Sequence, residues 1–132
     1  MALLGVLSFT AAVTDYAPEG AVSPDLGSLL GFSYQIAFNP TGGGTTCAVS
    51  IDSTVDDGLT WIDIARFDFT TTSSLAVGTN GALANVAPSA LAPLTSGQFR
   101  VFLGNRIRAR ITTTGTYSAG SNIRIDYFPR AV

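Results

Sequence analysis

The chain has 132 residues, enough for one domain with a two-layer core, and its 46% of apolar residues include no uninterrupted run of eighteen that could cross a membrane. Only 12% of the residues are charged, about half the usual share of roughly 25%, whereas a soluble monomer normally needs a more charged surface. We therefore expect other subunits to cover part of the surface. The chain has no His, and its single Cys falls on an apolar strand face, which removes the usual members of a nucleophile–base triad.

Acidic and basic residues are concentrated in opposite halves of the chain. Residues 1–69 hold eight acids and one Arg, a balance of −7, while residues 70–132 hold six Arg and one Asp, a balance of +5. All seven cations are Arg, which favours planar, bidentate pairing. This asymmetry can be neutralised inside the fold or between neighbouring subunits.

Residues 1–31 are expected to form an N-terminal arm or irregular segment ahead of a domain over residues 32–132. The opening MALLGVLSFTAAV lacks the positive region of a signal peptide and predicts a strand or an ordered arm that reaches onto a neighbour. Three Gly and two Pro between residues 14 and 31 exclude a long helix or strand there. The next segment, Phe32–Phe38, alternates apolar and polar residues and predicts a strand. A glycine run at 42–44 follows it, without the Lys and helix that a phosphate-binding loop requires.

The stretch Thr46–Phe69 predicts two strands joined by a turn. Cys47, Val49 and Ile51 alternate with small or polar residues, as in a strand with one buried face. On the second strand Trp61 and Ala65 are expected on the inner side and Ile64 on the opposite side, whose mixture of apolar and polar residues predicts a strand partly covered on both sides.

The turn between these strands, TVDDGLTW at 54–61, resembles the Asp-box of β-hairpin turns in sialidases and many other β proteins. In such a turn the Asp56 carboxylate accepts backbone hydrogen bonds, Gly58 takes the strained dihedral angle and Trp61 packs over the loop. The motif occurs once and indicates a structural turn, not a propeller or a catalytic site. Asp52, Thr54 and Asp56 have the spacing of alternating calcium ligands, but the Gly and Glu of an EF-hand loop are missing, so no metal is expected and a weak calcium site in this turn is the less favoured alternative.

The second half of the chain continues the β pattern. Short strands are predicted at 70–80 and 98–103, separated by an uncharged loop at 81–97 that either contacts a partner or crosses between sheets. The segments 106–113 and 122–128 are predicted to pair as a hairpin whose outer face carries an arginine row, made up of Arg106, Arg108, Arg110 and Arg124. This row is the candidate interface. The alternatives are a solvated or internally paired polar face and, less favoured because the chain is acidic and the face lacks aromatic residues, a nucleic-acid site.

These elements predict an all-β fold, an antiparallel β-sandwich of about seven or eight strands with a jelly-roll-like arrangement. The segment VSIDSTVDDGLTWIDIARFDFTT, followed after a Gly/Ala/Pro-rich loop by RIRARITTTGTYSAGSNIRIDYF, resembles sandwich modules of small structural proteins from tailed bacteriophages. The resemblance implies a virion component, assembled in the bacterial host cytoplasm and present in many copies, without catalysis or a cofactor.

Within a virion we expect a capsid decoration or cement protein that contacts the major capsid protein and forms a homo-oligomer, with a trimer favoured. Neither nucleic acid nor a membrane is expected as a partner. The alternative is a carbohydrate-binding module of a tail or head fibre, and a small Asp-dependent hydrolase ranks last. If the arginine row is an interface, charge reversal at Arg108 and Arg110 should impair assembly while leaving the isolated fold nearly as stable.

Overall fold

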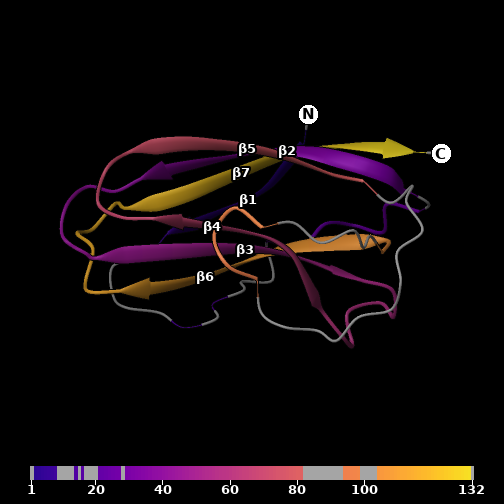
Figure 1. The fold of residues 1–132 in the computed structure, drawn as a ribbon, viewed down its shortest axis with the longest axis horizontal. Helices are drawn as coiled ribbons and strands as arrows, with labels where there is room; N and C mark the ends of the chain where they lie inside the picture. Colours follow the sequence, from indigo (N-terminus) through magenta and orange to yellow (C-terminus); the bar gives the residue numbers. More distant parts are fainter. Residues whose placement is uncertain are drawn as a thin grey trace.

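The computed structural model describes residues 2–8, 14, 16, 21–27, 29–81, 94–98 and 104–131. In this part of the chain seven strands and no α-helix form two antiparallel sheets that pack face to face (Figure 1). The larger sheet has the order β1-β7-β2-β5 and the smaller one β4-β3-β6. The predicted all-β sandwich is confirmed. The strands are β1 (Ala2–Ser8), β2 (Leu29–Asn39), β3 (Thr46–Thr54), β4 (Ile62–Phe69), β5 (Ser74–Gly81), β6 (Arg106–Thr114) and β7 (Asn122–Ala131).

The core between the sheets follows from the period-2 patterns of the strands. On β2 the inward residues Phe32, Tyr34, Ile36 and Phe38 are at most 4% exposed, as their alternation predicts. Aromatic rings join the two layers, because Phe38 stacks on Phe69 of β4 at 5.1 Å between ring centroids. Such pairs add about 0.5–1.5 kcal/mol each beyond the burial of their area.

The predicted hairpin of β3 and β4 forms, but it contains a β-bulge. Ile51 pairs with Ala65 and Asp52 with Asp63, so Ile64 is an extra residue on β4. Ile64 and Ala65 are both fully buried. The expectation that Ile64 and Ala65 lie on opposite sides of the strand is therefore wrong, because strict alternation cannot anticipate a bulge.

The predicted hairpin of residues 106–113 with 122–128 is wrong. Both strands exist, but β6 pairs with β3 in the smaller sheet and β7 pairs with β1 and β2 in the larger one. The connection at 115–121 crosses between the layers, and it carries the buried Tyr117, whose hydroxyl donates to the Thr70 carbonyl at 2.6 Å. The glycine run makes room for this ring, since a Cβ on Gly44 would lie 2.3 Å from ring atoms of Tyr117.

The N-terminal segment belongs to the sandwich. β1 pairs with β7 as an edge strand of the larger sheet, and Leu4 and Leu7 contribute to the core. Further along, Tyr16 exchanges backbone hydrogen bonds with Ile111, and the stretch 21–27 follows β6. Residues 2–8 are therefore a strand of the domain and not an arm that reaches onto a neighbour. The sandwich includes this strand, although the sequence pattern predicted a domain that begins at residue 32.

The region after β4 is described in part. The strand expected over 70–80 is present as β5. Most of the loop expected at 81–97 and of the strand expected at 98–103 lies outside the described residues. The described piece 94–98 runs beside β4, where the Gly97 amide donates to the Arg66 carbonyl at 2.9 Å.

Candidate functional site

The outer side of the smaller sheet carries most of the described charged residues, and we call it the charged face: Asp52, Asp57, Asp63, Arg66, Asp68, Arg106, Arg108 and Arg110. Its centre is Asp52 on β3, whose side chain is only 2% exposed. Asp52 lies directly across from Arg108 on β6, and its Oδ2 is 2.9 Å from Arg108 Nε and 3.1 Å from Arg110 Nε. One buried carboxylate thus holds two guanidinium groups in place.

Arg108 also covers the single tryptophan. Its guanidinium carbon lies 4.6 Å from the centroid of the Trp61 ring, which is a cation–π contact. The indole also lies next to Gly58 of the turn, where a Cβ added to Gly58 would lie 3.5 Å from Cζ2 of the ring. The expectation that Trp61 lies on the inner side of its strand is wrong. The ring instead joins the turn to the charged face.

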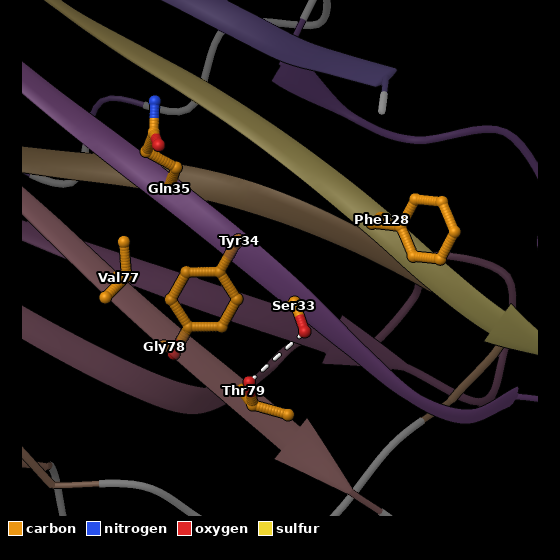
Figure 2. Close-up of a pocket in the computed structure, with 7 residues that line it drawn as sticks. All are labelled: Ser33, Tyr34, Gln35, Val77, Gly78, Thr79 and Phe128. Carbon is orange, nitrogen blue, oxygen red and sulfur yellow. Dashed lines mark hydrogen bonds between the residues drawn. The ribbon is translucent and has the colours of Figure 1, made fainter.

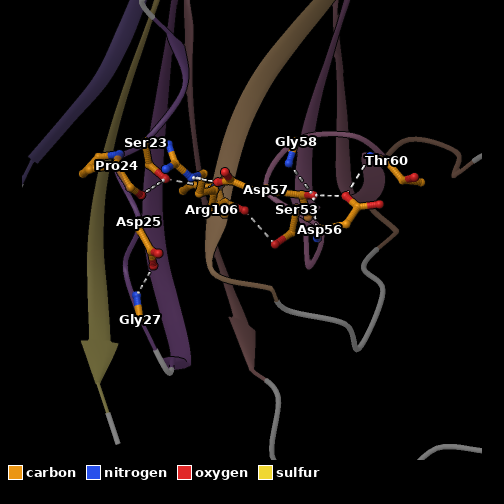
Figure 3. A network of polar contacts seen from close by, with 12 residues as sticks. Ser23, Pro24, Asp25, Gly27, Ser53, Asp56, Asp57, Gly58, Thr60 and Arg106 are labelled. Carbon is orange, nitrogen blue, oxygen red and sulfur yellow. Dashed lines mark hydrogen bonds and ion pairs between the residues drawn. The ribbon is translucent and has the colours of Figure 1, made fainter.

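The turn at 54–61 has the hydrogen bonds that its motif predicts (Figure 3). Asp56 Oδ1 accepts from the Thr60 amide and from the Thr54 hydroxyl, both at 2.8 Å, while Thr54 Oγ1 accepts from the Gly58 amide at 3.1 Å. The Thr60 amide first, and then the Thr54 hydroxyl, hold the pKa of Asp56 below its usual value. Gly58 adopts a φ of +92°. The turn is a closed structural unit.

A second polar network joins this turn to the start of β6 (Figure 3). Asp57, with a φ of +59°, places its Oδ1 2.9 Å from Arg106 Nε. The buried Ser53 hydroxyl donates to the Arg106 carbonyl and accepts from the Gly104 amide, both at 2.8 Å. On the other side of β6 the Ser23 hydroxyl accepts from the Ile107 amide at 2.9 Å. These contacts fix the strand that carries three of the arginines.

The structure divides the predicted arginine row. Arg106, Arg108 and Arg110 share one face, and each forms an ion pair with an acid from the first half of the chain. Arg124 lies on the larger sheet and pairs with Asp126 at 3.1 Å. Part of the charge asymmetry of the two halves is therefore neutralised inside the fold. Charge reversal at Arg108 and Arg110 would place two further acids beside Asp52, so it should also destabilise the isolated fold, contrary to the expectation from the sequence.

A shallow hollow of about 170 Å³ lies beside this cluster. Two of its charged residues are occupied by the segment at 94–98, since Asp63 Oδ2 accepts from the Leu94 amide at 3.0 Å and an Arg66 guanidinium nitrogen donates to the Leu94 carbonyl at 3.2 Å.

Burial raises the pKa of the Cys47 thiol to about 12, so that it stays protonated in the core. Among the described residues no group of three or more His, Cys, Asp or Glu could hold a metal ion.

The outer side of the larger sheet is different, and we call it the apolar face. It carries the exposed side chains Leu3 and Val6 on β1, Leu75 and Val77 on β5 and Phe128 on β7, with the Arg124–Asp126 ion pair between them. Figure 2 shows one part of it, a hollow of about 290 Å³ bordered by Val77, Gly78 and Phe128. The sequence prediction missed this face, although the alternation of Leu75 and Val77 within a polar strand was a signal for it.

No protein-family model matches the chain, and no curated protein or solved structure matches it either. Within the described residues no helix is long and apolar enough to span a membrane.

Proposed function

We propose that this protein is a non-enzymatic structural component of a tailed-bacteriophage virion, namely a capsid decoration or cement protein that self-associates and binds the major capsid protein. It would be made in the bacterial host cytoplasm and reside in the virion. The resemblance of residues 49–71 and 106–128 to phage sandwich modules supports this role. So does the small share of charged residues, which fits a protein whose surface is partly covered in an assembly.

The observation that carries the proposal is the unequal character of the two outer faces. The charged face is closed by its own ion pairs and by the turn, so its arginines are already neutralised. The apolar face exposes about half or more of each of five large apolar side chains. Large apolar side chains that gather on one outer face mark an interaction surface. A role in binding other proteins explains why one face is apolar and exposed while the arginines of the other are already paired. A nucleic-acid partner would instead need free cations.

The test uses capsids prepared without this protein. The purified protein is mixed with them, and the particles are sedimented over a range of protein concentrations. Saturable co-sedimentation, together with a higher temperature of capsid disruption, is the expected result for a cement protein. Protein that remains in the supernatant at every concentration would refute the proposal.

One observation favours a carbohydrate-binding module as the second candidate. The ring of Phe128 is 51% exposed beside the hollow on the apolar face, where Ser33 and Gln35 supply polar groups (Figure 2). An exposed ring with nearby hydroxyl and amide groups can stack on a sugar and bind its hydroxyls. Screening the protein against a glycan panel tests this function. This candidate would come first if the protein binds a glycan, loses that binding in Phe128→Ala and does not co-sediment with capsids.

A further inference from the structure

The apolar face has an ordered pattern that becomes visible when its residues are read across the strands. In the strand register, one row runs Leu3, Asp126, Gln35 and Val77 across β1, β7, β2 and β5. The next outward-facing row runs Val6, Arg124, Ala37 and Leu75 across the same strands. In both rows the edge strands contribute apolar residues and β7 contributes a charged residue. The two rows carry opposite charges at their β7 positions.

This pattern is self-complementary. Consider two copies stacked with their apolar faces together, related by a two-fold axis that lies between the sheets and runs along the rows. Rotation about this axis places each strand opposite the same strand of the other copy, with its direction reversed. The first row of one copy therefore faces the second row of the other. Leu3 then meets Val6, Val77 meets Leu75, and Asp126 meets Arg124, each contact occurring twice. Within these two rows apolar residues meet apolar residues and each charge meets its opposite, as an isologous interface requires, while the flanking rows bring Phe128 opposite Asn122.

The size of the face agrees with such a contact. Four strands about 4.8 Å apart and four outward rows about 6.8 Å apart cover roughly 500 Å² per copy, or about 1,000 Å² in total. This total lies at the lower limit for a specific protein–protein interface. Two sheets packed in this way also reproduce the face-to-face geometry of the sandwich itself.

We propose that the apolar face binds the apolar face of a second copy of this chain, around a two-fold axis that passes between Arg124 and Asp126. The inference deepens the self-association in the proposed function, and it assigns both the surface and the symmetry. It favours a two-fold pair over the trimer expected from the sequence, because a closed trimer joins two different surfaces, whereas this face complements itself. Capsid binding is a separate property, so failure of the capsid test leaves this inference standing.

The decisive experiment exchanges the charges. Arg124→Asp places Asp against Asp twice in the pair, and Asp126→Arg places Arg against Arg twice. Sedimentation velocity over a wide concentration range should show that each variant alone associates at least about tenfold more weakly than the wild type. An equimolar mixture of the two variants should recover association, because every opposed pair is then oppositely charged. Far-UV circular dichroism and urea unfolding check that each variant is folded.

A matched apolar pair serves as the second test and does not depend on the charge variants. Val77 lies on the apolar face and Val55 lies in the turn at 54–61, and both are 68% exposed. Val77→Asp should weaken self-association at least about tenfold, while Val55→Asp should leave it unchanged.

Three results would overturn the inference: a wild-type protein that is monomeric throughout, single variants that associate like the wild type, or a mixture no better than its components. The first result would also remove self-association from the proposed function. The other two would refute only this surface and its symmetry.

Discussion

Replacing Asp52 with Asn would remove the charge that holds Arg108 and Arg110 together. Breaking a buried ion pair by removing one partner costs about 3–5 kcal/mol, since the remaining charge is left uncompensated. The Asp52 side chain is 2% exposed, but the two arginine side chains are 24% and 26% exposed and can recover part of their hydration. We therefore expect Asp52→Asn to lower the free energy of unfolding by about 2–4 kcal/mol.

The matched control is Asp68→Asn. Asp68 pairs with Arg66 at 2.9 Å, but these side chains are 42% and 35% exposed, so this pair should contribute less than about 1 kcal/mol. Urea unfolding followed by far-UV circular dichroism compares the two variants. Fluorescence of Trp61 provides a second, local signal, because the indole touches Arg108. If Asp52→Asn costs no more than Asp68→Asn, the buried carboxylate does not stabilise the charged face and the reasoning fails.

Three further predictions concern the turns and the core. Gly44 and Gly27 both have a φ near +70°, but only at Gly44 would a Cβ collide with Tyr117, so Gly44→Ala should cost at least about 2 kcal/mol more in urea unfolding than Gly27→Ala. Because the native pKa of Asp56 is lowered, its ionised form stabilises the fold above the unshifted pKa of 3.8 and loses this effect as the pH falls through the native pKa. The stability advantage of the wild type over Asp56→Asn should therefore shrink below about pH 3.8, and an advantage that persists in acid would contradict the assignment. Cys47 is fully buried, so a thiol reagent should label it only at the rate of unfolding, and fast labelling of native protein would contradict its place in the core.

The residues of the turn at 54–61 illustrate what can be predicted locally. Thr54, Asp56 and Gly58 bond to one another within a few residues, so their spacing alone specifies the hydrogen bonds. The buried faces of β2 and β6 could also be predicted from the sequence, because alternation along one strand decides which side chains are buried. The inner or outer position of Trp61 could not, since a single bulge at Ile64 reversed the alternation, and no local signal marks the bulge.

The arginine row shows where prediction along the chain ends. The sequence places Arg108 and Arg124 on strands with similar patterns, and adjacency in the chain suggested a hairpin. Only the tertiary structure puts β6 and β7 in opposite sheets, and this separates Arg124 from the other arginines. It also brings Asp52 opposite Arg108, which turns an expected interface into an internally paired face.

The class of fold, the positions of most strands and the chemistry of the turn could be predicted from the residues alone, because each depends on the period of side chains along a strand or on bonds between near neighbours. The tertiary structure decided which strands are partners, which charges neutralise each other and which outer face stays apolar. These properties depend on contacts between residues far apart in the chain, such as Asp52 with Arg108. The pairing of strands sets those contacts, and the alternation within each strand is compatible with more than one pairing.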